Sequence, residues 1–209
     1  SSRDPDAADP GDWISTNEDA GIDFGGWLVN CGVSGSSWHG THVAGTVGAA
    51  TNNATGVAGV NWVSRIVPVR VLGKCGGYDS DIADAIEWAS GGAVSGVPAN
   101  AFPARVLNLS LGGGGACEPA LQSAITNALG RNAVVVVAAG NANADAAGST
   151  PANCNGVVTV AAVGGSGQRA SYSNFGPTVE IAAPGGGDGQ AVLSTLNSGT
   201  TVPLANGMN

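Results

Sequence analysis

The sequence has few positive charges and no long apolar run. Only 7 of its 209 residues are Lys or Arg, against 15 Asp and Glu, which gives a net charge of −8. A nucleic-acid-binding surface needs clustered Lys and Arg, so we expect no nucleic-acid partner. No apolar stretch reaches the roughly 20 residues of a membrane helix, and no basic-then-apolar segment marks a signal peptide at the start. We therefore expect no membrane partner and interpret the chain as a mature or excised piece.

Charged residues are also scarce, at 11%, whereas apolar residues make up 43% and Gly alone numbers 35. This balance argues against disorder and supports a real core with many tight turns. We see no internal repeat and no linker. We therefore predict one domain over residues 1–209, with an acidic loop at 1–38 and a core at 39–209.

The negative charge is concentrated at the N-terminus, where residues 1–23 hold seven carboxylates and one arginine. The simpler interpretation is a solvated acidic loop. The alternative is a structural calcium site, because Ca²⁺ takes six to eight oxygen ligands and Asp4, Asp6 and Asp9 offer several within a short span. The spacing is not that of an EF-hand.

The four cysteines are Cys31, Cys75, Cys117 and Cys154. None forms a Cys-x-x-Cys pair of the kind that binds zinc. An even number at wide spacing predicts two disulfides and an oxidising compartment. Three pairings are open, and four free buried thiols are the alternative.

Hydrophobic periodicity predicts alternating strands and helices. We expect helices over residues 41–50, 80–93 and 118–129, and strands over 66–72, 105–111, 133–139, 157–163, 179–183 and 191–196. The run at 133–139 is apolar throughout, which is typical of a strand buried on both faces. This order predicts an α/β fold with a parallel sheet covered by helices on both faces, and sites at the carboxyl ends of its strands.

Both histidines lie together at one predicted helix start. His39 directly precedes the helix, where the N-terminus favours the neutral imidazole that a general base needs. His42 lies one turn further in, and we interpret it as a buried packing residue. A zinc site on the pair is a weak alternative, because neither a His-Glu-x-x-His pattern nor a third ligand is present.

Asn141 follows the strand at 133–139 through Ala139 and Gly140. Its amide can donate a hydrogen bond to a developing oxyanion, although an Asn in a simple turn fits equally well. Two glycine-containing segments can leave backbone edges open for an extended peptide: Leu72, Gly73, Gly76 and Gly77, and Ser110, Leu111 and Gly112 onward. No Gly-Lys-Ser/Thr follows the second, so it is not a phosphate loop.

The segment His39-Gly40-Thr41-His42-Val43-Ala44-Gly45-Thr46 resembles the catalytic-histidine motif of the subtilisin-like serine proteases, the subtilases. Further family-like motifs follow in the family's order: Arg70–Gly73, Asn108–Gly113, Ala138–Asn141, Ser171–Gly176 and Ala182–Gly185. The resemblance covers about residues 30–200 and is strongest to secreted bacterial members.

The resemblance implies a three-layer αβα sandwich with a mostly parallel central sheet, incomplete in this chain. It implies a serine endopeptidase with a Ser-His-Asp triad, in which His39 is the general base and Asn141 the oxyanion donor. Ala139 and Gly140 and the two glycine-containing edges would then bind an extended peptide or protein substrate.

The resemblance also implies an extracellular protein with the disulfide pairs Cys31–Cys75 and Cys117–Cys154. No catalytic metal is expected. Structural calcium is expected in the family, and Asn52-Asn53 resembles a family calcium loop only loosely.

Two family motifs are missing from the sequence. Neither Asp-Ser/Thr-Gly nor Gly-Thr-Ser-Met-Ala occurs, and the nearest approach to the second, Ser198-Gly199-Thr200-Thr201, lacks Met-Ala. We therefore predict a middle segment that is inactive alone and is completed by the remaining pieces of the same protease. The alternative is an inactive fragment or pseudo-protease that binds peptides. For the substrate residue before the cleaved bond, the sequence leaves two preferences open: large apolar side chains and basic side chains.

Overall fold

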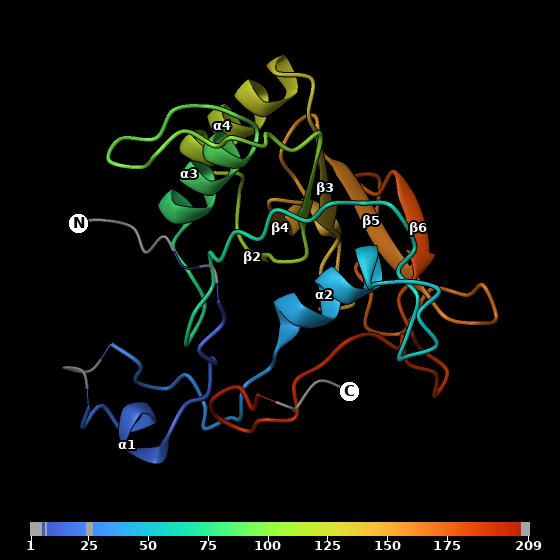
Figure 1. Cartoon of the computed structure of the whole chain (residues 1–209). Helices are drawn as coiled ribbons and strands as arrows, with labels where there is room; N and C mark the ends of the chain where they lie inside the picture. The colour runs from blue at the N-terminus through green and yellow to red at the C-terminus, as the bar shows by residue number, and fades with distance from the viewer. Residues whose placement is uncertain (1–5, 7, 24–26, 206–209) are drawn as a thin grey trace. The chain divides into compact units, whose positions relative to one another are not determined.

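The computed structural model describes residues 6, 8–23 and 27–205. The chain divides into two compact units. The sheet unit comprises residues 79–192, and the histidine unit comprises the described residues up to 78 together with 193–205. Figure 1 labels their helices and strands. The expectation of one domain stays a prediction.

The sheet unit is built on a parallel sheet in the order β1-β3-β5-β6. Its strands are β1 (Val106–Leu109), β3 (Val134–Ala138), β5 (Val158–Val163) and β6 (Ile181–Pro184). All three neighbouring pairs run parallel, with Asn108 opposite Val136 and Ala138 opposite Val160. A short antiparallel pair joins β2 (Gly113–Gly114) to β4 (Ser149–Thr150), directly after the 3-10 helix η2 (Ala146–Gly148). The α/β class with a mostly parallel sheet is confirmed.

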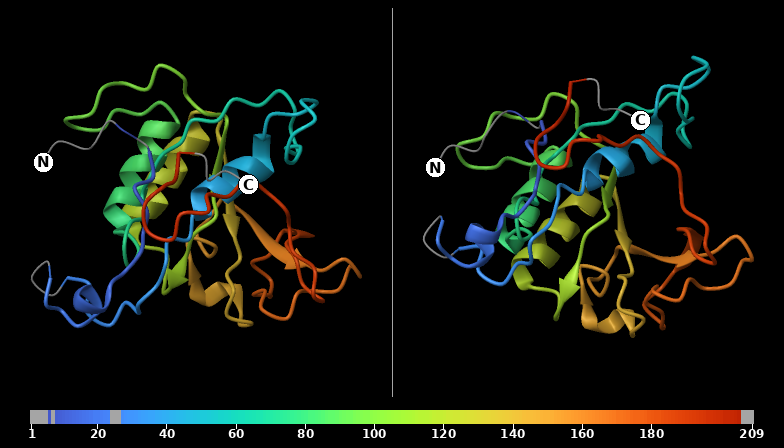
Figure 2. Two further views of the ribbon diagram at one scale, coloured as in Figure 1. Left: turned by 60° about the horizontal axis from the view of Figure 1, so that its bottom comes forward. Right: turned by 90° about the horizontal axis from the view of Figure 1, so that it is seen from below.

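Helices α3 (Asp79–Ala89) and α4 (Pro119–Gly130) lie side by side over one face of this sheet (Figures 1 and 2). Leu121 and Ile125 of α4 and Val135 and Val137 of β3 are almost completely buried. Burying each such side chain contributes about 1.5–3 kcal/mol. Pro119 at the first turn suits the start of α4, since its fixed φ is helical and it lacks an N–H that would have no partner there.

Helix α3 ends four residues before the predicted limit at residue 93. Gly91 has a φ of +94° and so turns the chain out of the helix. The Ser90 hydroxyl donates to the Ile86 carbonyl at 2.8 Å and satisfies one acceptor of the last turn. The helical spacing of apolar residues predicted the helix correctly, but the glycine pair at 91–92 terminates it.

The expectation that β3 is buried on both faces is wrong. On the face away from α4, Val106, Val134 and Ile181 are 61%, 44% and 57% exposed. A run of valines allows a strand to be buried on both faces, but other segments must pack on the second face. The sequence of the strand alone does not show whether they do.

The histidine unit contains α1 (Thr16–Asp19) and α2 (His39–Gly48) and is otherwise built of loops and turns. The predicted strands at 66–72 and 191–196 are wrong, because no strand is formed in either segment. β-branched residues favour an extended backbone, yet a strand also needs a hydrogen-bonded neighbour. No helix among the described residues is long and apolar enough to span a membrane.

Candidate active site

His39 is the first residue of α2, and its side chain is exposed. Trp38 before it is 3% exposed and donates its indole N–H to the Gly199 carbonyl at 2.6 Å. The backbone N–H of His39 donates to the Ser37 hydroxyl at 3.3 Å, and this hydroxyl donates in turn to Asp12 at 2.7 Å. The tryptophan anchor and these polar contacts fix the backbone on which the imidazole is presented at the surface.

Small residues in α2 allow a second chain segment to lie directly against it. The hydroxyls of Ser194 and Thr195 donate to the carbonyls of His42 and Thr41, at 2.6 and 2.9 Å. A Cβ on Gly45 would collide with both hydroxyl oxygens, so this position requires glycine. His42 itself is half-buried rather than buried as expected.

The predicted edge at Leu72, Gly73, Gly76 and Gly77 is a tight hairpin in the histidine unit. Gly73 and Gly76 exchange backbone hydrogen bonds of 2.9 and 3.3 Å. A Cβ on Gly77 would collide with the Val71 carbonyl. Cys75 at the turn is joined to Cys31 by one of the two expected disulfides.

Lys74 ties the same hairpin to α1. Its ammonium pairs with Glu18 and lies 3.7 Å from the centre of the Trp13 ring. Glu18 also accepts from the Ser15 N–H at 2.8 Å while Ser15 caps Glu18, which forms a capping box. The hydrogen bond from Lys74, followed by that from Ser15, lowers the pKa of Glu18 to about 2.

In the sheet unit, a cavity of about 520 Å³ opens at the carboxyl ends of the strands. Its polar lining comes from Asn108, Ser110, Asn141, Tyr172 and Ser173, and Gly140 lines it as well. This is the edge at which sites form in open parallel sheets. Ser110, Ala139, Gly140 and Asn141 were predicted from sequence, and the fold brings these four to one cavity. Leu111 and Gly112 do not line it.

The predicted open edge beyond Ser110 is partly occupied by the protein itself. Gly113 and Gly114 pair with Thr150 and Ser149 as β2 and β4, so one side of this glycine run is already hydrogen-bonded. The Asn108 amide donates to the Ser110 hydroxyl at 2.9 Å. Leu111 and Gly112 lie outside any strand.

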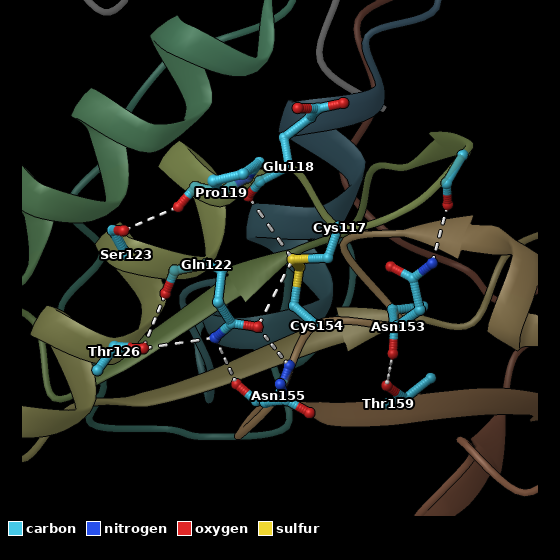
Figure 3. Close-up of a disulfide and its surroundings, with 12 residues drawn as sticks. Cys117, Glu118, Pro119, Gln122, Ser123, Thr126, Asn153, Cys154, Asn155 and Thr159 are labelled. Atoms are coloured by element: carbon cyan, nitrogen blue, oxygen red, sulfur yellow. Dashed lines mark hydrogen bonds between the residues drawn. A yellow bond between two sulfur atoms is a disulfide. The ribbon is translucent and has the colours of Figure 1, made fainter.

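The second disulfide, Cys117–Cys154, holds this region together (Figure 3). Beside it, the Gln122 amide accepts from the Asn155 N–H at 2.8 Å and donates to the Asn155 carbonyl at 3.1 Å. Asn153 donates to the Gly115 carbonyl at 2.8 Å. The loop after the candidate substrate edge is therefore fixed against the segment that carries β4. Both expected cysteine pairs are confirmed.

His39 belongs to the histidine unit and Asn141 to the sheet unit. That these two residues share one site, and that the edges at Leu72 and Ser110 flank it together, therefore stay predictions. Sequence reasoning missed the Glu18–Lys74–Trp13 contacts and the side chains beneath the Asn141 loop. The Ser15-Thr16-Asn17-Glu18 capping-box pattern was a visible signal for the first.

The calcium expectation at Asp4, Asp6 and Asp9 gains no support. Asp4 lies outside the described residues. Asp6 and Asp9 each accept from the N–H two residues on, at 2.9 Å. Within the described ranges, no group of three or more His, Cys, Asp or Glu could hold a metal ion, so the histidine pair also lacks a third ligand there. A cavity of about 210 Å³ lies within the loop at 52–58, whose lining offers amide and carbonyl oxygens.

Comparison with known proteins gives one consistent result. Residues 30–209 match the model of the subtilase family. The chain is 58% identical to an extracellular protease of Xanthomonas campestris pv. campestris over 202 residues, which are 96% of this chain and 33% of that protein. It is 47% identical to an extracellular basic protease of Dichelobacter nodosus, over 97% of this chain and 32% of that protein.

A solved structure of a protease from Pseudoalteromonas arctica PAMC 21717 superposes with a TM-score of 0.88 at 55% identity, over 96% of this chain and 58% of that one. The chain thus spans about a third of the length of the curated relatives it matches. Because residues 30–209 match the family model and the identity to both relatives is above 45%, this chain belongs to the subtilase family of serine proteases.

Proposed function

We propose that this chain is part of a secreted serine endopeptidase and supplies the general base His39 and the oxyanion donor Asn141. The observation that carries the proposal is the cavity at the carboxyl ends of the strands, where Ser110, Gly140 and Asn141 converge in a chain of this family. The names of the relatives and the two disulfides support secretion.

The proposed reaction begins with proton transfer from a serine hydroxyl to His39 as the serine oxygen bonds to the peptide carbonyl carbon. The carbonyl oxygen becomes an oxyanion, and the Asn141 amide donates a hydrogen bond to it. His39 then protonates the leaving amine, and water releases the acyl group by the same route. An aspartate would orient the imidazole. The family motifs for the serine and the aspartate are not found in the 209 residues.

The proposed substrate is a peptide or protein bound as an extended strand. Backbone groups of Ser110, Leu111 and Gly112 would hold one side, and those of Leu72, Gly73, Gly76 and Gly77 the other. The disulfides and the Lys74 ion pair keep both edges in place before substrate arrives. The remaining pieces of the same protease would be the other partner.

The alternative is an inactive fragment or pseudo-protease that binds peptides without cutting them. Neither triad motif occurs in these residues. This alternative predicts the same binding of an extended peptide but no covalent chemistry.

The test uses the product of the complete gene, with a covalent probe for activated serine and an extended peptide substrate. We expect labelling and hydrolysis, and a loss of about 10⁶-fold in kcat for His39→Ala, the magnitude known for the histidine of a subtilisin. His42→Gln is the matched control on the same helix and should stay within a few-fold.

Peptide binding without labelling or hydrolysis would favour the pseudo-protease. Equal losses at His39 and His42, together with inhibition by a zinc chelator, would favour the metal alternative.

A further inference from the structure

Asn174 lies in the family-like motif Ser171–Gly176, to which the proposed function gives no role. Its side chain is 1% exposed. A buried amide is costly unless its donors and acceptors are paired, so its partners show what it is there to hold.

The Asn174 amide pairs on both sides of the loop that carries Asn141. Its Nδ2 donates to the Ala139 carbonyl at 2.9 Å and to the Ser149 hydroxyl at 3.0 Å. Its Oδ1 accepts from the N–H groups of Ala142 and Ala144, at 2.9 and 3.1 Å. These four bonds use the full capacity of an amide, with two donors and two lone pairs.

The backbone completes the attachment. The N–H of Asn174 donates to the Gly140 carbonyl at 2.9 Å. Gly140 has a φ of +106°, and a Cβ there would collide with the Asn174 amide nitrogen. The glycine therefore serves two purposes: it turns the chain sharply after β3, and it lets the buried amide reach the backbone on either side of residue 141.

We propose that Asn174 is a positioning residue for Asn141. It fixes the backbone from Ala139 to Ala144, so that the exposed Asn141 amide is held at the cavity instead of moving with a free loop. The inference rests on the proposed function, because positioning matters only if Asn141 stabilises an oxyanion. Such donors are effective when they are oriented before charge develops, and a buried, fully paired network provides that orientation.

Two substitutions separate the donor half of the amide from the acceptor half. Asn174→Ala removes all four side-chain bonds. Asn174→Asp keeps the acceptors for Ala142 and Ala144 but places an oxygen against the Ala139 carbonyl. In the product of the complete gene, we expect kcat to fall about 10–100-fold in Asn174→Ala, because a misplacement of about 1 Å can cost about 10²-fold, and we expect KM to change little. We expect a smaller loss in Asn174→Asp.

Asn100 provides a matched control. Its Nδ2 donates to the Trp88 and Ala89 carbonyls at 3.2 Å, and its Oδ1 accepts from the Phe102 N–H at 2.8 Å. It thus organises the loop after α3 in the same chemical way, and none of these residues lines the cavity. Asn100→Ala should lower the Tm and leave kcat unchanged.

Amide hydrogen exchange over residues 139–145, followed by mass spectrometry, is the readout independent of activity. We expect faster exchange in Asn174→Ala, an intermediate rate in Asn174→Asp and no change in Asn100→Ala. The inference is overturned if exchange there is the same in wild type and both Asn174 variants, or if these variants lower kcat no more than Asn100→Ala.

An inactive wild type would instead count against the proposed function, and the exchange data would still decide whether Asn174 holds the loop. If Asn174→Ala does not fold, Asn174→Asp carries the same comparison.

Discussion

The two candidate catalytic residues are held in opposite ways. His39 begins a helix and is held by hydroxyl and carboxylate contacts of a loop, together with the buried ring of its neighbour Trp38. Asn141 lies in the loop that follows β3, and this loop is held from beneath by the buried Asn174 amide. The first arrangement leaves most supporting polar contacts exposed to solvent, whereas those of the second are buried or part-buried. The difference teaches that the supports of the two candidate residues differ in how easily water can compete for them.

Removing each disulfide in turn should cause the largest change, a loss of folding stability in the two regions compared. Cys31 and Cys75 are 44 residues apart, and Cys117 and Cys154 are 37 apart, so loop-closure entropy predicts about 4 kcal/mol of lost stability for either pair. Chemical denaturation of the two double Cys→Ser variants measures this. A much larger loss for one pair would show that its surroundings, and not loop length, decide the effect.

Asn141→Ala sharpens the comparison on the catalytic side. The side chain is exposed, so stability should hardly change, whereas kcat should fall about 10²–10³-fold, the magnitude known for an oxyanion donor in a subtilisin. Kinetics and thermal unfolding on the same preparation test both halves. Asn143→Gly, two residues along the same exposed loop, is the control, because glycine adopts the φ of +51° at this position without strain. A fall in Tm as large as that of Asn174→Ala would contradict the assignment.

Glu18 gives a pH test of the histidine unit. Its pKa is lowered from 4.5 to about 2 in the folded chain, so the stability it contributes is present above pH 4.5 and is lost as pH falls from there towards 2. Glu18→Gln should flatten this part of the stability–pH curve. Lys74→Met, which removes the partner of Glu18, should flatten the same part of the curve. Equal slopes in all three proteins would refute the role of Glu18.

Calcium should have the smallest effect. If the loop at 52–58 binds Ca²⁺, millimolar calcium should raise the Tm by a few degrees over a chelator-treated sample, since a ligand bound only by the folded state stabilises it. Asn53→Ala should abolish the shift, and Asp9→Asn should not. A shift lost only in Asp9→Asn would move the site to the acidic N-terminal segment.

Regular structure was predictable wherever its causes are local. Helix α4 was placed to within a residue, because its apolar period and Pro119 belong to the helix itself. The four strands of the sheet were found with limits within two residues of those observed. The strand predicted at 66–72 failed because its β-branched residues could not supply a pairing partner.

The candidate site was predictable only in part. Asn141 and its neighbours were singled out because Ala138–Asn141 resembles a family motif, whereas the local sequence alone fits a simple turn equally well. Asn174 acts on residues some 30 positions earlier in the chain, and Lys74 pairs with a carboxylate 56 positions away. Contacts of this kind arise from tertiary packing, which periodicity and local motifs do not encode.

The close approach of Gly140 and Asn174 also has an evolutionary consequence. A side chain at 140 needs the space that the amide occupies, and the φ of +106° disfavours a side chain there even when residue 174 is smaller. Position 140 should therefore stay glycine across related sequences, including those in which residue 174 differs. A mutagenesis library that varies both positions should yield folded variants with glycine at 140 whatever residue stands at 174.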